Sequence, residues 1–229
     1  MQRTILITGS NGNLGQDVIS TLSAAGHRII ATIGSGDIPE SLKQQTISQH
    51  RVDLLNETAA DTFVRESIEL HPQIDAAVLL VGGFAMGGID VTNEAMLDKQ
   101  ISLNFKTVWF IIKPLIAHFK TLGGGQIIMI GARPAIQPEE GKNVVAYALS
   151  KSLLFSLAEI INNDGKDFGI TASIIVPGVL DTPPNRKAMP DANFKDWVNT
   201  SVVADSISFI LSESGKNLRQ PLFKLYNRS

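Results

Sequence analysis

Two side chains that could exchange a proton and bind sugar hydroxyls lie four residues apart, Tyr147 and Lys151. On a helix this spacing places them on the same face, within reach of one another. A phenol has a pKa near 10, but an ammonium group about 4 Å away favours the phenolate by up to about 4 kcal/mol before desolvation is subtracted. The pair could therefore tether a ribose and exchange a proton with a substrate. A solvated helix face is the alternative for such a pair taken alone.

A glycine-rich turn lies near the start of the chain, where Gly9, Gly12 and Gly15 occur within TGSNGNLG after an apolar run. Glycines at such spacing allow a tight turn, close approach of the backbone to a pyrophosphate, and close packing of a helix on a strand. The first amides of the helix then face an anion, which the helix dipole favours. We expect this turn to bind a dinucleotide; a glycine-rich turn that binds nothing is the alternative.

The end of the second predicted strand bears on the choice between NADH and NADPH. In dinucleotide folds an acid there binds the ribose 2′-hydroxyl and repels a 2′-phosphate. Here Gly34 follows the strand, and the nearest acid, Asp37, comes three residues later, where a turn role is more typical of it. Asp53, near the end of the third predicted strand, either lies near an adenine ring or caps the next helix. The sequence leaves the choice of nucleotide open.

Glycines also follow the fourth predicted strand, where Gly82 and Gly83 precede Phe84 and Met86. Ligand clefts in open α/β sheets form at the carboxyl ends of the strands, and glycines there let backbone approach a ligand. We expect the glycines to contact the cofactor and the two larger side chains to line the substrate pocket. A flexible loop and ordinary packing are the alternatives.

The sequence predicts alternating strands and helices, which would position these residues. The strands are predicted at 4–8, 28–33, 49–54, 75–81, 125–130, 170–176 and 222–226, and the helices at about 13–25, 58–70, 93–119 (kinked at Pro114), 144–165 and 202–212. The pattern predicts one α/β domain over residues 1–229, a Rossmann fold with a doubly wound parallel sheet of about seven strands in the order 3-2-1-4-5-6-7. Residues 179–200 lack a clear period and are expected to form a substrate loop over the cleft.

The composition argues against several other classes of protein. The formal net charge is −2 and no basic stripe occurs, so nucleic acid is not an expected partner. The chain has no cysteine, and its four histidines lack metal-ligand spacing, so we expect no disulfide and no metal site. Apolar runs are broken before the roughly 18 residues that a membrane span needs, and no signal-peptide pattern is evident. We expect a cytoplasmic protein with a small-molecule substrate and no membrane partner.

Over essentially its full length the chain resembles the short-chain dehydrogenase/reductase family. The matching pieces are TGSNGNLG, Asp53, Asn104, YALSK at 147–151 and PGVLDT at 177–182. The resemblance implies that Tyr147 is the acid–base residue, that Lys151 lowers its pKa and binds ribose, and that Asn104 holds a helix kink and a proton-relay water. The cofactor-binding residues predicted from the motifs and from this resemblance are Gly9, Asn11, Gly12, Asn13, Leu14, Gly15, Gly34, Asp53, Gly82, Gly83, Lys151, Pro177, Gly178, Val179 and Thr182.

The chain departs from the family pattern at two places. Its glycine-rich loop is spaced G-x-x-G-x-x-G instead of G-x-x-x-G-x-G, and Gly131-Ala132 stand where the family has a serine that hydrogen-bonds the substrate carbonyl oxygen. Without that serine, ordinary ketone or alcohol chemistry is in question, since Ser150 and Ser152 lie on the next helix.

Within the family the chain is most similar to the dihydropteridine reductases. They share the loop without serine, the Gly-Gly-aromatic stretch and a segment like LDTPPNRKAMPDANFKDW at 180–197. This resemblance implies a homodimer, joined through the helices from Asn93 and Val144, that reduces a quinonoid dihydropterin with NADH or NADPH. Such a substrate spreads charge over several nitrogens, so one oxyanion donor is less needed. The predicted substrate residues are Phe84, Met86, Ala132, Asn185 and Met189.

Two alternatives stay open from the sequence. One is a carbonyl or quinone reductase of the same family, and the other is a dinucleotide-binding sensor or scaffold without catalysis.

Overall fold

Short apolar runs form the central strands of a parallel sheet, and every residue of β1 (Thr4–Thr8) and β4 (Ala76–Leu79) is buried. The computed structural model describes residues 2–34, 47–219 and 221–229. The sheet has seven strands in the order β3-β2-β1-β4-β5-β6-β9, which confirms the predicted fold class and strand order. The remaining five strands of this sheet are β2 (Arg28–Ile33), β3 (Ile47–Arg51), β5 (Gly125–Ile130), β6 (Ile170–Pro177) and β9 (Leu222–Leu225).

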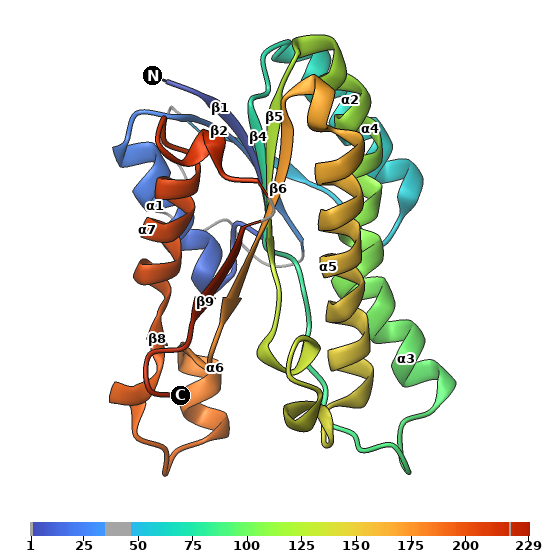
Figure 1. Cartoon of the computed structure of the whole chain (residues 1–229), viewed down its shortest axis with the longest axis vertical. Coiled ribbons are helices and arrows are strands. Elements are labelled where there is room, and N and C mark those ends of the chain that lie inside the picture. Colours follow the sequence, from blue (N-terminus) through green and yellow to red (C-terminus); the bar gives the residue numbers. More distant parts are fainter. Residues whose placement is uncertain (1, 35–46, 220) are drawn as a thin grey trace.

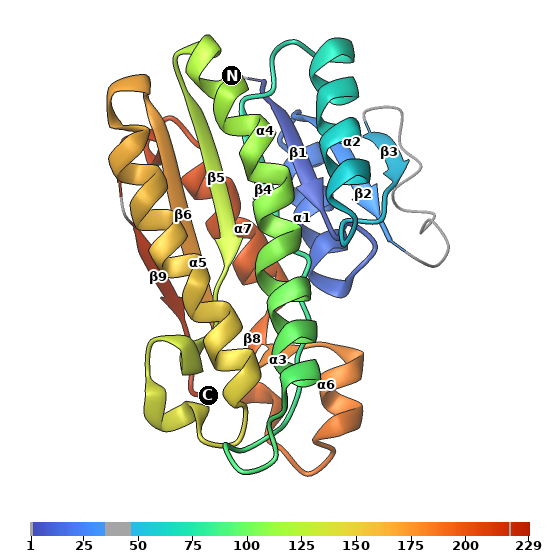
Figure 2. The same cartoon turned by 90° about the vertical axis from the view of Figure 1, so that its right-hand side faces the viewer.

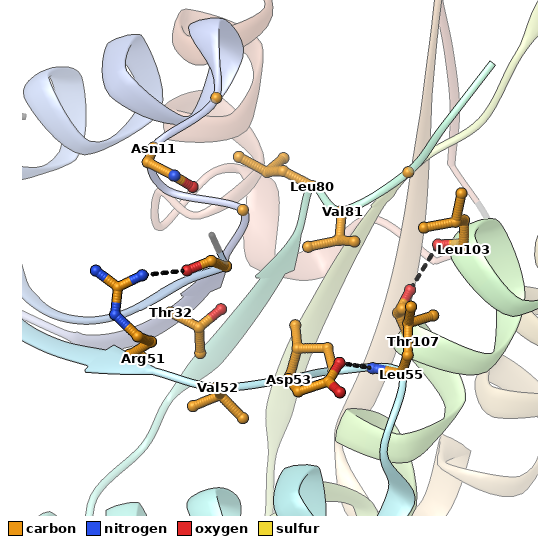
Figure 3. Close-up of a pocket in the computed structure, with 15 residues that line it drawn as sticks. Asn11, Thr32, Arg51, Val52, Asp53, Leu55, Leu80, Val81, Leu103 and Thr107 are labelled. Atoms are coloured by element: carbon orange, nitrogen blue, oxygen red, sulfur yellow. Dashed lines mark hydrogen bonds between the residues drawn. The ribbon is translucent and has the colours of Figure 1, made fainter. Parts of the chain in front are cut away.

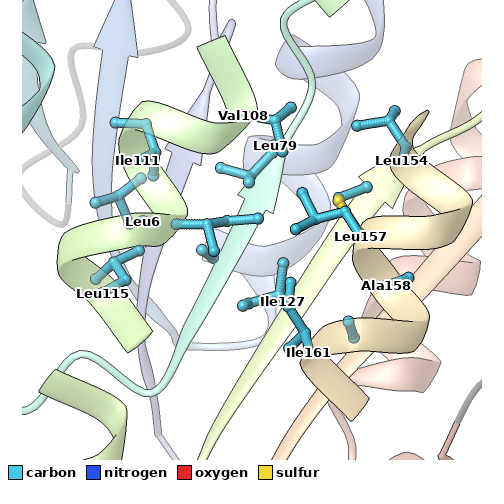
Figure 4. Close-up of a cluster of buried hydrophobic side chains, with 14 of the residues drawn as sticks. Leu6, Leu79, Val108, Ile111, Leu115, Ile127, Leu154, Leu157, Ala158 and Ile161 are labelled. Carbon is cyan, nitrogen blue, oxygen red and sulfur yellow. The ribbon is translucent and has the colours of Figure 1, made fainter. Parts of the chain in front are cut away.

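Helices cover both faces of the sheet (Figures 1 and 2). One face carries α1 (Asn13–Ala24) and α7 (Thr200–Ile210), and the other carries α2 (Glu57–Leu70), α4 (Thr107–Leu122) and α5 (Val145–Asp164). Leu6, Leu79 and Ile127 point from the strands into the second layer, where they meet apolar side chains of α4 and α5 (Figure 4). The carboxyl ends of the strands are thereby held at one edge, where a ligand cleft is expected.

Helix α5 is long and apolar enough, by length and composition alone, to cross a membrane. In this fold it packs against the sheet, and Leu154, Leu157 and Ile161 belong to the buried core. A buried core helix of an α/β domain can have the same length and hydropathy. The packing of α5 against the sheet therefore explains its apolar sequence.

Three predicted segments differ most from those observed, while the other bounds agree to within about two residues. The third strand ends at Arg51 instead of Leu54, because the chain turns at Asp53, whose Oδ1 accepts a hydrogen bond of 3.0 Å from the amide of Leu55. The helix predicted at 93–119 begins after Asn93 as expected but is divided by a π-helical turn, Ser102–Lys106, into α3 (Glu94–Ile101) and α4. Pro114 lies inside α4, which continues on both sides of it.

The third difference is the segment predicted as a loop at 179–200. It contains a two-stranded ladder, β7 (Leu180–Asp181) with β8 (Val198–Asn199), and a short helix between them, α6 (Pro183–Ala188). Pro183 and Pro184 occupy the first turn of α6, where a missing amide hydrogen costs nothing.

Candidate active site

The glycine-rich turn shapes the start of α1 as an anion site. Gly9 has φ of 73°, and the amide of Gly12 donates to the carbonyl of Gly9 at 3.1 Å. A Cβ on Gly15 would lie 2.3 Å from that carbonyl oxygen, so only glycine lets the helix approach the strand here. Gly12 caps α1 without a side-chain bond, and the first turn, with Asn13 and Leu14, carries no acid. Its amides and dipole therefore suit a phosphate.

A cavity of about 720 Å³ opens beside this turn, at the carboxyl ends of β1, β2, β3 and β4 (Figure 3). Its volume is typical of a site for a small molecule or cofactor. The residues that line it are Gly9, Asn11, Gly12, Thr32, Gly34, Arg51, Val52, Asp53, Leu54, Leu55, Leu80, Val81, Gly82, Leu103 and Thr107.

Six of the predicted cofactor residues line this cavity: Gly9, Asn11, Gly12, Gly34, Asp53 and Gly82. The cavity is also lined by residues that were not predicted from the sequence, among them Thr32, Arg51 and Leu103. Thr32 and Arg51 could have been found only from their positions near the carboxyl ends of two strands, where ligands of a parallel sheet bind.

The two acids considered for cofactor choice have different outcomes. Asp53 lines the cavity and does not cap the next helix, since that role belongs to Asn56, whose side chain accepts from the amide of Ala59 at 3.0 Å. Its contact with an adenine ring stays a prediction. Asp37 lies outside the described residues.

Asn104 is a fully buried hub in the π-helical turn. Its Oδ1 accepts from the amide of Gly83 at 2.9 Å, and its Nδ2 donates to the carbonyl of Gly83, to Oε1 of Gln100 and to Oγ of Ser150, each at 3.0 Å. The side chain thus joins the loop after β4 to α3 and α5. The predicted irregularity of the helix at Asn104 is present, while its link to a relay water stays a prediction.

Lys151 and Tyr147 lie on α5 and are not among the described residues that line this cavity. Lys151 is buried, and its Nζ donates to the carbonyl of Ile130 at 2.7 Å. A Cβ on Gly82 would lie 3.2 Å from Nζ and 2.8 Å from Oδ1 of Asn104, so glycine at position 82 keeps the edge of the cavity open toward both groups. This arrangement brings Gly82, Lys151 and Asn104 together.

Burial governs the acid–base properties of the pair. It raises the pKa of Tyr147 to about 12 and lowers the pKa of Lys151 to about 8. Both shifts favour the neutral forms, because desolvation penalises a charge of either sign. The pKa of Tyr147 in this structure therefore lies above its ordinary value, opposite to the lowering by Lys151 that the resemblance implied.

The predicted substrate residues differ in exposure and contacts. Phe84 is 63% exposed, and its ring meets the ring of Tyr147 edge-on, and Met86 and Met189 are also exposed. Ala132 is buried. Asn185 uses its side-chain amide within its own segment, donating to the carbonyl of Leu180 at 2.8 Å.

The predicted contacts on the nicotinamide side are held by the end of the chain. The amide of Gly178, which follows Pro177, donates to the carbonyl of Leu225 at 2.9 Å, and the amide of Val179 donates to Oγ of Ser229 at 3.3 Å. Thr182 caps α6, where its hydroxyl accepts from the amide of Asn185. Their contacts with a cofactor stay predictions.

The donor set fits a nicotinamide dinucleotide. The glycine turn and the uncapped start of α1 suit a pyrophosphate, the cavity suits an adenosine, and Gly82, at the edge of the cavity, lies next to Lys151. The contact of a bound nicotinamide with Lys151 and Tyr147 stays a prediction.

Known proteins resemble the chain over most of its length. The sequence pattern of the short chain dehydrogenase family matches residues 3–193. A dihydropteridine reductase of Dictyostelium discoideum is 26% identical over 214 residues, which cover 90% of this chain and 87% of that protein. An acetoacetyl-CoA reductase of Acinetobacter sp. (strain RA3849) is 23% identical over 198 residues, which cover 80% of this chain and 76% of that protein.

Solved structures share the fold. The structure described as ElxO with NADP bound has a TM-score of 0.89 at 18% identity, over 98% of this chain and 97% of that one. A short-chain dehydrogenase/reductase from Serratia marcescens BCRC 10948 has a TM-score of 0.87 at 20% identity, over 99% and 98% of the two chains. With the family pattern matched from residue 3 to residue 193, and with the fold and the glycine turn in place, the chain belongs to the short-chain dehydrogenase family.

Proposed function

We propose that this short-chain dehydrogenase reduces a quinonoid dihydropterin-like substrate with NADH or NADPH. As a member of its family the chain is an NAD(P)H-dependent oxidoreductase, and the proposal concerns the substrate and the residues that act on it. The observation that carries the proposal is the pairing of the exposed Phe84 ring with Tyr147, which gives a flat heteroaromatic substrate an aromatic wall beside the acid–base group.

The residues have distinct roles in this proposal. Reduced nicotinamide, when bound, supplies the hydride. Tyr147 donates its hydroxyl proton to a substrate nitrogen, and Lys151 stabilises the phenolate that remains. Asn104 positions the loop at Gly83 against α5 through its four hydrogen bonds. Proton and hydride together account for the two-electron reduction.

Ala132 stands where the family has a serine, and this replacement supports a quinonoid substrate. A ketone develops charge on one oxygen and needs a donor there, whereas a conjugated quinonoid spreads that charge over several atoms. The relative from Dictyostelium discoideum carries the name dihydropteridine reductase, which favours the same class.

A carbonyl reductase of the same family is the second candidate, and the relative named acetoacetyl-CoA reductase favours it. The test follows nucleotide oxidation with quinonoid dihydropterin, a simple quinone and acetoacetyl-CoA, for wild type and for Tyr147→Phe. The proposal expects the highest kcat/KM with the pterin and its loss in the variant. A higher kcat/KM with the quinone or with acetoacetyl-CoA than with the pterin would contradict the proposal and favour that compound as the substrate. Binding of nucleotide without any turnover would indicate the sensor instead.

We also propose a cytoplasmic homodimer joined through α5 and the helical segment from Asn93, which comprises α3 and α4. Leu149, Leu153 and Ile160 share one face of α5 and are exposed, as is Trp109 on α4. A partner helix would bury this apolar face. Light scattering of wild type and of Leu153→Lys tests the dimer, which the lysine should dissociate, and cell fractionation tests the location.

A further inference from the structure

Arg133 joins the loop after β5 to the residues that follow β9. It comes directly after Ala132 and is half-buried. Its Nη1 donates to the main-chain oxygen of Ser229 at 2.9 Å. Within its own loop, Nε donates to Oε1 of Gln137 and Nη2 donates to Oε1 of Glu140, each at 2.8 Å. Every nitrogen of the guanidinium therefore has a protein partner, which is typical of an arginine that holds segments together.

The loop that Arg133 holds leads directly into the helix of the acid–base pair. Its second 3₁₀ turn, Pro138–Gly141, contacts the start of α5, because the amide of Val144 donates to the carbonyl of Gly141 at 2.9 Å. Tyr147 follows on α5 within the next turn. A displacement of this loop would therefore displace the start of α5 and the hydroxyl of Tyr147 with it.

Ser229 carries the link onward to the turn that follows β6. Its Oγ accepts from the amide of Val179 at 3.3 Å, and a Cβ on Gly178 would clash with the same Oγ. Glycine at position 178 thus lets the two segments approach closely. Arg133 and Val179 are thereby connected through one residue, by its main-chain oxygen on one side and its hydroxyl on the other.

Residues 226–229 also hold the far end of the predicted substrate loop. Nδ2 of Asn227 donates to the carbonyls of Lys195 and Trp197, each at 3.0 Å. Figure 1 shows the end of the chain beside β8, the strand that follows these two residues. The segment therefore contacts the substrate loop near both of its ends, and Arg133 fixes this segment to the loop after β5.

We infer that Arg133 is a positioning residue of the proposed reaction, which holds the substrate loop at a fixed distance from the start of α5. The inference rests on the proposed function, in which Tyr147 protonates a substrate that this loop covers. In this role Arg133 contacts neither substrate nor cofactor and acts on Val179 through Ser229. The distance it sets matters because a displacement of about 1 Å between reacting groups can cost about 10²-fold in rate.

Kinetics and nucleotide binding together test this role. Arg133→Ala should lower kcat at least about tenfold with whichever acceptor wild type reduces, quinonoid dihydropterin, quinone or acetoacetyl-CoA. Affinity for 5′-AMP should be unchanged, because the described residues that line the cavity lie between Gly9 and Thr107. The matched control is Arg228→Ala, an exposed arginine whose amide, kept in the variant, donates to the carbonyl of Asp196 at 3.2 Å.

A conservative variant separates positioning from charge. Arg133→Lys keeps the positive charge but lacks the planar fork that bonds to three partners, so it should recover only a small part of kcat. Full recovery in Arg133→Lys would indicate that a charge alone is needed, as for direct contact with a substrate, and would overturn the inference.

A double variant tests the route through Ser229. Ser229→Ala removes the hydroxyl that bonds to Val179 and keeps the main-chain oxygen that Arg133 uses, so it should also lower kcat. If Arg133 acts through Ser229 the two losses overlap, and the double variant should be no more than about twofold slower than Arg133→Ala. Multiplied losses, or a Ser229→Ala protein as fast as wild type, would overturn this route.

Hydrogen exchange gives a measurement that does not depend on the reaction. In Arg133→Ala the amides of Gly178 and Val179 should exchange at least about tenfold faster than in wild type, with the amides of β1 unchanged. Unchanged exchange at these two amides, or faster exchange with the kcat of wild type, would overturn the inference. If wild type reduces none of the three acceptors, the proposed function fails, while the exchange of these amides still decides whether Arg133 holds the loop.

Discussion

The ring of Phe84 meets the ring of Tyr147 edge-on, with the ring centroids 5.1 Å apart and the planes inclined by 71°. Phe84→Ala removes this contact and one wall of the proposed substrate pocket. We expect KM for the quinonoid dihydropterin to rise about 3–10-fold, the worth of one aromatic contact, with the affinity for nucleotide unchanged. Steady-state kinetics check this. Ile89→Ala, in the same loop and 85% exposed, is the control. An unchanged KM for Phe84→Ala would place the substrate elsewhere.

The chain has two tyrosines, and they give a matched pair of variants. Tyr147→Phe removes the proposed proton donor, so kcat should fall about 10²–10⁴-fold with nucleotide affinity kept. Tyr226→Phe removes a buried hydroxyl that has no hydrogen-bond partner among the described residues, so both kcat and the free energy of unfolding should hold. Single-turnover rates and nucleotide fluorescence measure these effects. Equal losses in the two variants would remove the special role of Tyr147.

Burial of Lys151 makes the stability of the nucleotide-free protein depend on pH. Its pKa is about 8 in the folded protein against an ordinary value of 10.5, so between these values the unfolded chain binds more protons. The free energy of unfolding should therefore rise with pH through this window.

Urea unfolding at pH 7.5 and 9.5 checks this expectation. The free energy of unfolding of wild type relative to Lys151→Met should increase by about 1–2 kcal/mol. Lys113→Met, which removes an exposed pair with Glu57, should show no such trend. A difference between wild type and Lys151→Met that stays flat would show that Lys151 remains charged throughout.

Asn104 should contribute to stability as well as to activity. Asn104→Ala leaves the partly buried amide and carbonyl of Gly83 without their partner, and the free energy of unfolding should fall by about 2–4 kcal/mol. Asn93→Ala removes only a helix cap and should cost about 1 kcal/mol. Chemical denaturation ranks the two variants. Equal losses would show that the hub adds nothing beyond an ordinary cap.

The sequence predicted the strands best where apolar runs end at glycine or polar residues. β1, β2 and β5 have the predicted bounds, because short apolar runs bounded in this way are typical of buried strands. β3 was misplaced because its sequence, ISQHR, has no apolar run, and its pairing with β2 defines it instead. The π-helical turn also escaped prediction, since one wide turn leaves the apolar period of a helix nearly unchanged.

The site shows the same division between local and distant signals. Glycines identified the phosphate turn and the loop after β4 because their backbone conformations and close approaches are local needs. Arg51 and Leu103 escaped because their place in the cavity depends on which strands and helices become neighbours. The hydrogen bond from the amide of Val179 to Oγ of Ser229 likewise joins residues that no local sequence pattern relates.

The order in which the chain leaves the ribosome divides the site in two. All residues that line the cavity lie between Gly9 and Thr107, so this half is synthesised early. The amides of Gly178 and Val179 find their partners only when Leu225 and Ser229 have emerged. A nascent chain arrested before β9 therefore contains every described residue that lines the cavity but lacks the partners of Gly178 and Val179, and we expect the two parts of the site to become ordered in that sequence during synthesis.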